Sequence, residues 1–169
     1  MEIKDYVKNE FDSLKRTSTR VLDTMTQQEL MWRPASGCNS SGLILFHVAR
    51  SEDSFVQTRL QGKPQIWESE KWHNKLNMGE AETGSHYTVD QVNAFRVPNM
   101  KELLDYYDAV RVSTLHYLSS LTPDAFDKII KLPFGEFTVA GVLSLVVSHT
   151  AQHLGEISYL RGMLRGMDK

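Results

Sequence analysis

Apolar residues recur at every third or fourth position in four long segments of the chain, with polar residues between them. This spacing places the apolar side chains on one face of an α-helix. The segments are residues 3–25, 41–61, 100–121 and 138–164. Four long amphipathic helices bury their apolar faces against one another, so the pattern predicts an all-α fold, a four-helix bundle. The length of 169 residues fits a single domain, 1–169.

The connection between the second and third of these helices is unusually long. Residues 62–87 show no helical periodicity and contain scattered glycine, proline and tryptophan. A connection of this length can cross the whole bundle, so the second and third helices need not be antiparallel neighbours. Trp67 and Trp72 could line the mouth of a substrate site, but aromatic side chains in a long irregular connection more often anchor it to the bundle.

The shorter connections carry capping and turn residues. The spacing of Thr26 and Glu29 matches a capping box and predicts a short helical turn that ends before Pro34. A second short helical turn is expected at 88–91. Thr122 and Pro123 have the form of an N-cap followed by proline in the first helical position, which predicts a brief helix through residue 130. Residues 131–137 are expected to form a turn, and no segment has the pattern of a β-hairpin.

Composition narrows the classes of function. Hydrophobic residues make up 41% of the chain, charged residues make up 24%, and the formal net charge is −2, which is ordinary for a globular protein. Lysine and arginine form no cluster, so nucleic-acid binding is not expected. The longest apolar run, 139–147, is far shorter than the ~20 residues of a membrane span. The charged first residues predict no signal peptide, and the single cysteine, Cys38, fits a reducing compartment, so the expected location is cytoplasmic.

Three histidines are the candidate metal ligands. His149 and His153 are four residues apart in the last helical segment, so their imidazoles leave the same face of the helix about 5–6 Å apart. Taken alone, such a pair is more often an ordinary structural feature than a metal site. His47, in the second helical segment, is the candidate third ligand, on a face that is apolar on one side and small and polar on the other. Three nitrogen ligands would leave one position of a zinc ion open for water or substrate.

Glu156 lies on the same helical face as His149 and His153. Its carboxylate could orient a histidine, act as a base toward bound water, or bind the metal itself. Gln152 is a weaker candidate for supporting a ligand. The chain's other histidines, His73, His86 and His116, carry no pattern that assigns them a role. Gly155, inside the last helix, is expected to allow close helix packing, because glycine otherwise weakens a helix by ~1 kcal/mol.

Several of these motifs together resemble the DinB/YfiT-like superfamily of metalloenzymes, along essentially the whole chain. They are the T-x-x-E-L-x-W-R-P turn at 26–34, the S-S-G-L-I-L-F-H-V-A-R-S-E-D segment that contains His47, and the late H-x-x-x-H-x-G-[QE] motif. His149, His153, Gly155 and Glu156 match the late motif, in which glutamine is common at the position of Glu156.

The resemblance implies an up-down-down-up four-helix bundle with a long connection between the second and third helices. It also implies a divalent metal, zinc or nickel, held by His47, His149 and His153. Characterised relatives include a mycothiol-dependent maleylpyruvate isomerase and bacillithiol S-transferases, so a low-molecular-weight thiol is an expected cofactor. Relatives are often dimers, so a homodimer is expected as well.

Three hypotheses on function follow. The first is an enzyme whose metal activates a small thiol for S-transfer to a small-molecule substrate. The second is a metal-dependent hydrolase in which bound water attacks and Glu156 acts as the base. The third is a non-catalytic helical module that binds metal or pairs with another protein. No nucleic acid or membrane partner is expected for any of them.

Overall fold

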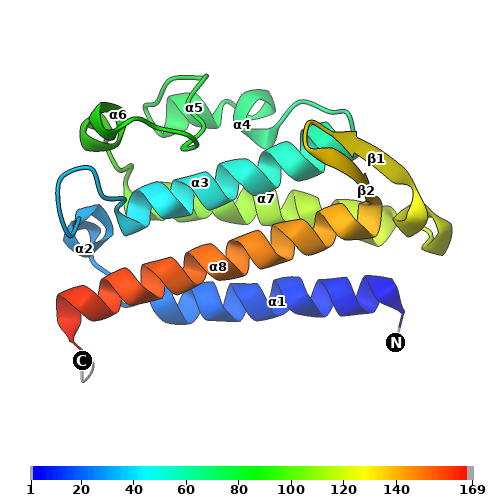
Figure 1. The fold of residues 1–169 in the computed structure, drawn as a ribbon, viewed down its shortest axis with the longest axis horizontal. Coiled ribbons are helices and arrows are strands. Elements are labelled where there is room, and N and C mark those ends of the chain that lie inside the picture. Colours follow the sequence, from blue (N-terminus) through cyan, green and yellow to red (C-terminus); the bar gives the residue numbers. More distant parts are fainter. Residues whose placement is uncertain (1, 167–169) are drawn as a thin grey trace.

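The computed structural model describes residues 2–166 and is mostly helical (Figure 1). Residues 1 and 167–169 of the predicted domain lie outside the described residues. The four long helices are α1 (Ile3–Leu22), α3 (Ser41–Asp53), α7 (Met100–Ser120) and α8 (Val139–Arg165). They lie side by side, and α3 packs against both α7 and α8, as does α1. The four predicted segments therefore form helices, and their buried faces meet in one core.

Two of the long helices differ from the prediction, one in length and one in helix type. The first helix ends at Leu22 rather than at Met25. The second predicted helix continues beyond Asp53 as a π-helical segment, η1 (Ser54–Leu60), in which the helix widens by one residue per hydrogen-bonded turn. Such π-helical insertions change the direction in which the following side chains point, and they occur frequently at functional sites.

Short helices occupy the connections, and their starts follow the predicted capping residues. Thr26 and Glu29 form the capping box of α2 (Gln27–Met31), and Thr88 and Gln91 form that of α6 (Val89–Ala94). The remaining short helices are α4 (Ile66–Ser69), α5 (Trp72–Lys75) and the 3₁₀-helix η2 (Pro123–Asp127). None of the helices in residues 2–166 is both long enough and apolar enough to cross a membrane.

A β-hairpin precedes α8, which corrects the expectation of a brief helix through residue 130 and a simple turn at 131–137. Strands β1 (Ile129–Leu132) and β2 (Gly135–Thr138) pair antiparallel, with Leu132 opposite Gly135. Only Pro133 and Phe134 connect them. Proline lacks a backbone N–H and suits this unpaired position, whereas the strands are too short and too polar to show a period-two pattern. The Thr138 side chain then accepts a hydrogen bond from the Gly141 amide and caps α8.

An ion pair joins three of the long helices inside the core. Arg111 of α7 makes two hydrogen bonds to the carboxylate of Glu52 in α3, at 2.8 and 2.7 Å. The side chains are 6% and 0% exposed. The same guanidinium donates to the backbone carbonyl of Phe11 in α1 at 3.1 Å and to the Tyr107 hydroxyl at 3.0 Å. One side chain thus fixes the relative positions of α1, α3 and α7.

The long connection is held against α3 and α7 by a second buried carboxylate. Asp53, at the end of α3, accepts hydrogen bonds from the amides of Ile66 and Trp67 and from the Tyr106 hydroxyl, each at 2.9 Å. Trp67 is fully buried and Trp72 is 9% exposed, as expected of anchors. This arrangement holds the segment from α4 to α6 along α3 (Figure 1).

Candidate metal centre

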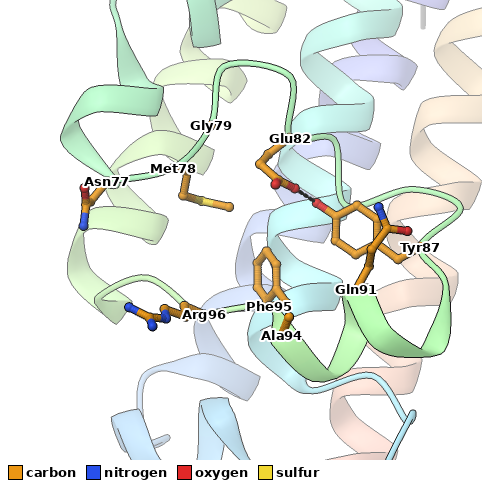
Figure 2. Close-up of a pocket in the computed structure, with 9 residues that line it drawn as sticks. All are labelled: Asn77, Met78, Gly79, Glu82, Tyr87, Gln91, Ala94, Phe95 and Arg96. Carbon is orange, nitrogen blue, oxygen red and sulfur yellow. Dashed lines mark hydrogen bonds between the residues drawn. The ribbon is translucent and has the colours of Figure 1, made fainter.

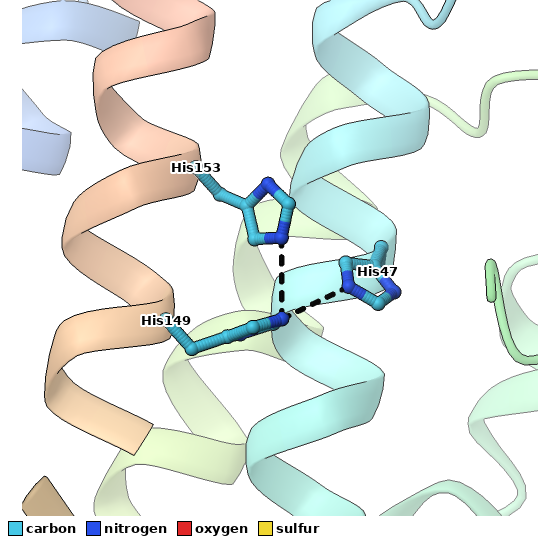
Figure 3. Close-up of side chains that lie close together, drawn as sticks. All are labelled: His47, His149 and His153. Carbon is cyan, nitrogen blue, oxygen red and sulfur yellow. Dashed lines mark hydrogen bonds between the residues drawn. The ribbon is translucent and has the colours of Figure 1, made fainter. Parts of the chain in front are cut away.

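The three predicted histidines come together between α3 and α8 (Figure 3). His47 projects from α3, and His149 and His153 project from neighbouring turns of α8. The Nε2 atom of His149 lies 3.0 Å from Nε2 of His47 and 3.2 Å from Nε2 of His153. One ligand atom from each of the three side chains lies within 4.8 Å of the others. The arrangement requires α3 and α8 to be neighbours, and they are.

The spacing of the three nitrogens fits a metal ion better than hydrogen bonding among the histidines. A neutral imidazole Nε2 carries either one hydrogen or one lone pair, so Nε2 of His149 can hydrogen-bond only one of its two neighbours. Zinc–nitrogen bonds of about 2.0–2.1 Å at tetrahedral angles separate the nitrogens by about 3.3–3.4 Å. The observed separations of 3.0 and 3.2 Å are close to this value. A cation between the rings would use all three lone pairs.

Two of the histidines have a partner on the nitrogen that faces away from the centre. Nδ1 of His47 lies 2.9 Å from the hydroxyl of Ser85, and Nδ1 of His153 lies 2.7 Å from the carboxylate of Glu156. A hydrogen on Nδ1 leaves the lone pair on Nε2, where a metal would bind, and such partners also fix the orientation of the ring. The carboxylate of Glu156 therefore lies against the outer nitrogen of His153.

The surroundings keep His47 and His149 neutral. Burial lowers the pKa of His47 from 6.5 to about 4, with smaller contributions from His149, His153 and His86. Burial also lowers the pKa of His149; the proximity of His153 adds to this effect, and Glu156 opposes it. Neutral imidazole is the form that binds a metal ion, so these two side chains are in the metal-binding form at neutral pH.

Two cavities open on the histidines, from opposite sides of the His47 face. The larger, of about 530 Å³, contains His47 and His149 together with Ser51 and Ser54. The smaller, of about 230 Å³, contains His47 and His153 together with the apolar Leu43 and Ile44. The predicted division of this face into a polar and an apolar side is therefore the division between the two cavities. The volume of the larger cavity lies within the range of small-molecule sites.

The loop beside His47 supplies site residues that sequence reasoning missed. Ser85 and His86 line both cavities, and Ser85 binds His47 directly. The preceding Gly84 has φ +72°, and a Cβ at this position would lie 3.1 Å from Cα of His47. Glycine thus lets the loop approach the helix backbone. His86 itself has φ 56°, which is rare for a residue with a side chain. The Gly-Ser-His sequence at 84–86 was the only available signal for this loop. Because the segment has no helical periodicity, the sequence could not show which helix the loop contacts.

The structure places two residues of α8, Gly155 and Gln152, in surroundings that differ from those expected. Gly155 was expected to permit close helix packing, yet a Cβ built at this position would meet no atom within 4 Å, so packing does not require glycine there. Gln152 lines a separate open groove of about 620 Å³, together with Cys38, Gly155 and the other side of Glu156. That groove includes none of the three histidines.

A further cavity, of about 260 Å³, lies within the segment that joins η1 to α7 (Figure 2). The Tyr87 hydroxyl donates a hydrogen bond to the Glu82 carboxylate there. Burial and this neighbouring carboxylate raise the pKa of Tyr87 to about 12, so the phenol stays protonated. The cavity contains none of the three clustered histidines, and the tyrosine–glutamate bond serves to close the loop that carries Ser85.

Comparisons with known proteins identify a family and, separately, a similar fold. A family model described as the DinB superfamily matches residues 10–157. The chain is also similar to a conserved protein from Enterococcus faecalis of known crystal structure, with a TM-score of 0.84 and 22% sequence identity over 99% of each chain. At that identity the likeness shows the fold alone. No curated protein matches the chain.

Proposed function

The chain belongs to the DinB superfamily, and from this premise we propose that it is a divalent-metal-dependent enzyme that activates a small thiol for S-transfer. In this proposal His47, His149 and His153 hold zinc or nickel through their Nε2 atoms. The observation that carries it is the convergence of these three nitrogens, at 3.0 and 3.2 Å, from two helices that are far apart in the sequence. We interpret the four long helices as the up-down-down-up bundle expected for this family.

The residues around the centre support an open rather than a closed metal site. Three imidazole ligands leave a fourth position vacant, whereas a purely structural zinc site has four protein ligands. A divalent metal there would lower the pKa of a bound thiol and stabilise the thiolate at neutral pH. His47 and His149 line the larger cavity, so a thiol bound at the open position would have space for a substrate beside it. The substrate is proposed to be a small molecule.

The metal content of the purified protein tests the proposal. Protein purified without chelators or a histidine tag is expected to contain about one zinc or nickel ion per chain, and His149→Ala is expected to contain none. His149 is the informative position because its Nε2 contacts both other histidines. Elemental analysis of the wild type and His149→Ala measures the number of metal ions per chain directly.

A matched control removes a histidine from the surface. His116 is exposed on α7, so His116→Ala should retain the full metal content. Wild-type protein that neither contains metal nor takes up added zinc or nickel would overturn both enzyme hypotheses and leave the non-catalytic helical module.

Glu156 distinguishes thiol transfer from hydrolysis, the second candidate. Its carboxylate is 2.7 Å from Nδ1 of His153, a bond that the side-chain oxygen of glutamine can also accept. Under the thiol hypothesis, Glu156→Gln should therefore retain metal and most of the transfer activity. A general base contributes about 10²–10⁴-fold to a rate, so hydrolysis would fall by that factor in the same variant.

The measurement compares the wild type with Glu156→Gln in both thiol transfer and hydrolysis. Small thiols are offered together with an aromatic electrophile whose conjugation changes its absorbance, and ester hydrolysis is followed in parallel. Retained transfer in Glu156→Gln supports the first hypothesis, whereas a specific loss of hydrolysis supports the second.

A homodimer and a cytoplasmic location remain predictions from the family and the sequence.

A further inference from the structure

The larger cavity beside the three histidines has a cationic lining. Its charged side chains are Arg50 and Arg59, and His86 adds a third nitrogen heterocycle to those of His47 and His149. Among the residues that line it, all of them within 2–166, there is no aspartate or glutamate. A cavity lined by one sign of charge concentrates ligands of the opposite sign. A divalent metal at the centre would add to this positive potential.

Arg50 is a fixed part of the cavity wall. Its Nε donates to the Glu82 carbonyl at 3.0 Å and its Nη1 to the side-chain oxygen of Gln65 at 2.7 Å. The guanidinium also lies 4.6 Å from the centre of the Trp67 ring. The Asp53 carboxylate, 3.7 Å behind it, offsets part of its charge. Arg50 therefore shapes the cavity but is not its main unpaired charge.

Arg59 is the unpaired charge. It is exposed at the cavity mouth, and within residues 2–166 its side chain makes neither a hydrogen bond nor an ion pair. Its position depends on the π-helical segment η1, in which hydrogen bonds join residues five apart, so that Arg59 lies about one turn beyond Ser54. Arginine presents a planar fork of donors that matches a carboxylate or phosphate group.

We infer that this cavity binds a small anionic substrate, and that Arg59 contacts its carboxylate or phosphate group. The inference rests on the proposed metal-dependent enzyme, because it names the substrate class of the same site. Ser51 and Ser54 offer hydroxyl donors near the anionic group, and Phe55 and Leu145 offer apolar surface for the rest of the molecule. The substrate is thus a compact organic anion with an apolar part.

Binding of an anion and of its neutral isostere tests the inference. The probes are 3-phenylpropionate and 3-phenylpropionamide, titrated calorimetrically into zinc-loaded and metal-free protein. The anion is expected to bind at least tenfold more tightly, and Arg59→Ala should weaken its binding about tenfold, because one charge-assisted hydrogen-bonding partner is lost. Binding of the amide should not change. Arg59→Lys should recover part of the loss, and phenylphosphonate tests whether a phosphate-like group is preferred.

The control is Arg16→Ala, which removes an exposed arginine from α1 and should leave both probes unaffected. Equal binding of anion and amide, an anion preference that Arg59→Ala leaves unchanged, or no measurable binding of either anion up to its solubility limit would each overturn the inference. Metal content is measured on the same samples. Metal bound normally without an Arg59 effect contradicts only the substrate class, whereas no metal with an Arg59-dependent anion preference contradicts only the metal-dependent reaction.

Discussion

Arg111→Ala is expected to lower the free energy of unfolding by about 3–5 kcal/mol, because it leaves the carboxylate of Glu52 buried without its cation. Glu52 is fully buried and both of its oxygens bond to Arg111, at 2.8 and 2.7 Å. The substitution also removes the link from α7 to the carbonyl of Phe11 in α1. Urea denaturation of metal-free protein, followed by circular dichroism, measures the loss without a contribution from bound metal.

Two further variants separate the free-energy cost of leaving one buried charge unpaired from the loss of the ion pair itself. Glu52→Ala should destabilise by a similar amount, because the guanidinium of Arg111 is then left unpaired. The double variant Arg111→Met/Glu52→Leu removes both charges and restores apolar volume, so it should recover at least half of the single-variant loss. Additive losses in the double variant would contradict this explanation. Lys101→Ala, which breaks an exposed pair with Asp105, should change stability by less than about 1 kcal/mol.

Asp53→Ala is expected to cost about 3–4 kcal/mol, because several buried donors lose their acceptor at once and each costs about 1–3 kcal/mol. The donors are the amides of Ile66 and Trp67 and the hydroxyl of Tyr106. The amides belong to the start of α4, so the long connection should loosen from α3. Urea denaturation gives the loss, and hydrogen exchange at residues 66 and 67 shows whether it arises in that segment.

The amide substitution and an exposed aspartate serve as controls. Asp53→Asn keeps one acceptor oxygen and should be less destabilising than Asp53→Ala. Asp12 pairs with Lys8 on the surface of α1, and Asp12→Ala should change stability by less than about 1 kcal/mol. Unchanged protection at residues 66 and 67 in Asp53→Ala would show that other contacts hold the connection.

The part of the site that could be predicted from the sequence is the part encoded within one helix. His149 and His153 are one turn apart, so their common face follows from helical geometry alone, and so does the reach of Glu156 to His153. His47 was a candidate from its own helical segment, but its contact with the other two histidines was expected only from the resemblance to a family, because no local rule states which helices become neighbours. Packing of α3 against α8 then brings its Nε2 to 3.0 Å from that of His149.

The features that the sequence analysis missed lie in loops or in segments whose local structure depends on tertiary contacts. Ser85 reaches His47 only because the long connection folds back along α3, held by Asp53 and Trp67. Arg59 was counted within a regular helix, and η1 widens that helix near its end. The hairpin at 129–138 contains four-residue strands, too short for a periodic pattern. Gly155 shows the opposite error, a packing role expected where no neighbour exists.

The sequence by itself determined where the four long helices lie, which residues cap the short ones, and that one helix presents two histidines on a single face. These properties depend on residues within one or two turns of each other, and local hydrogen bonding and hydrophobic periodicity encode them. Only the tertiary structure decided that α3 and α8 meet at His47, and that a loop supplies Ser85 and His86. It also placed Arg59 at the mouth of a cavity without acidic side chains among its lining residues. Such contacts depend on the packing of the whole core, which no short segment specifies.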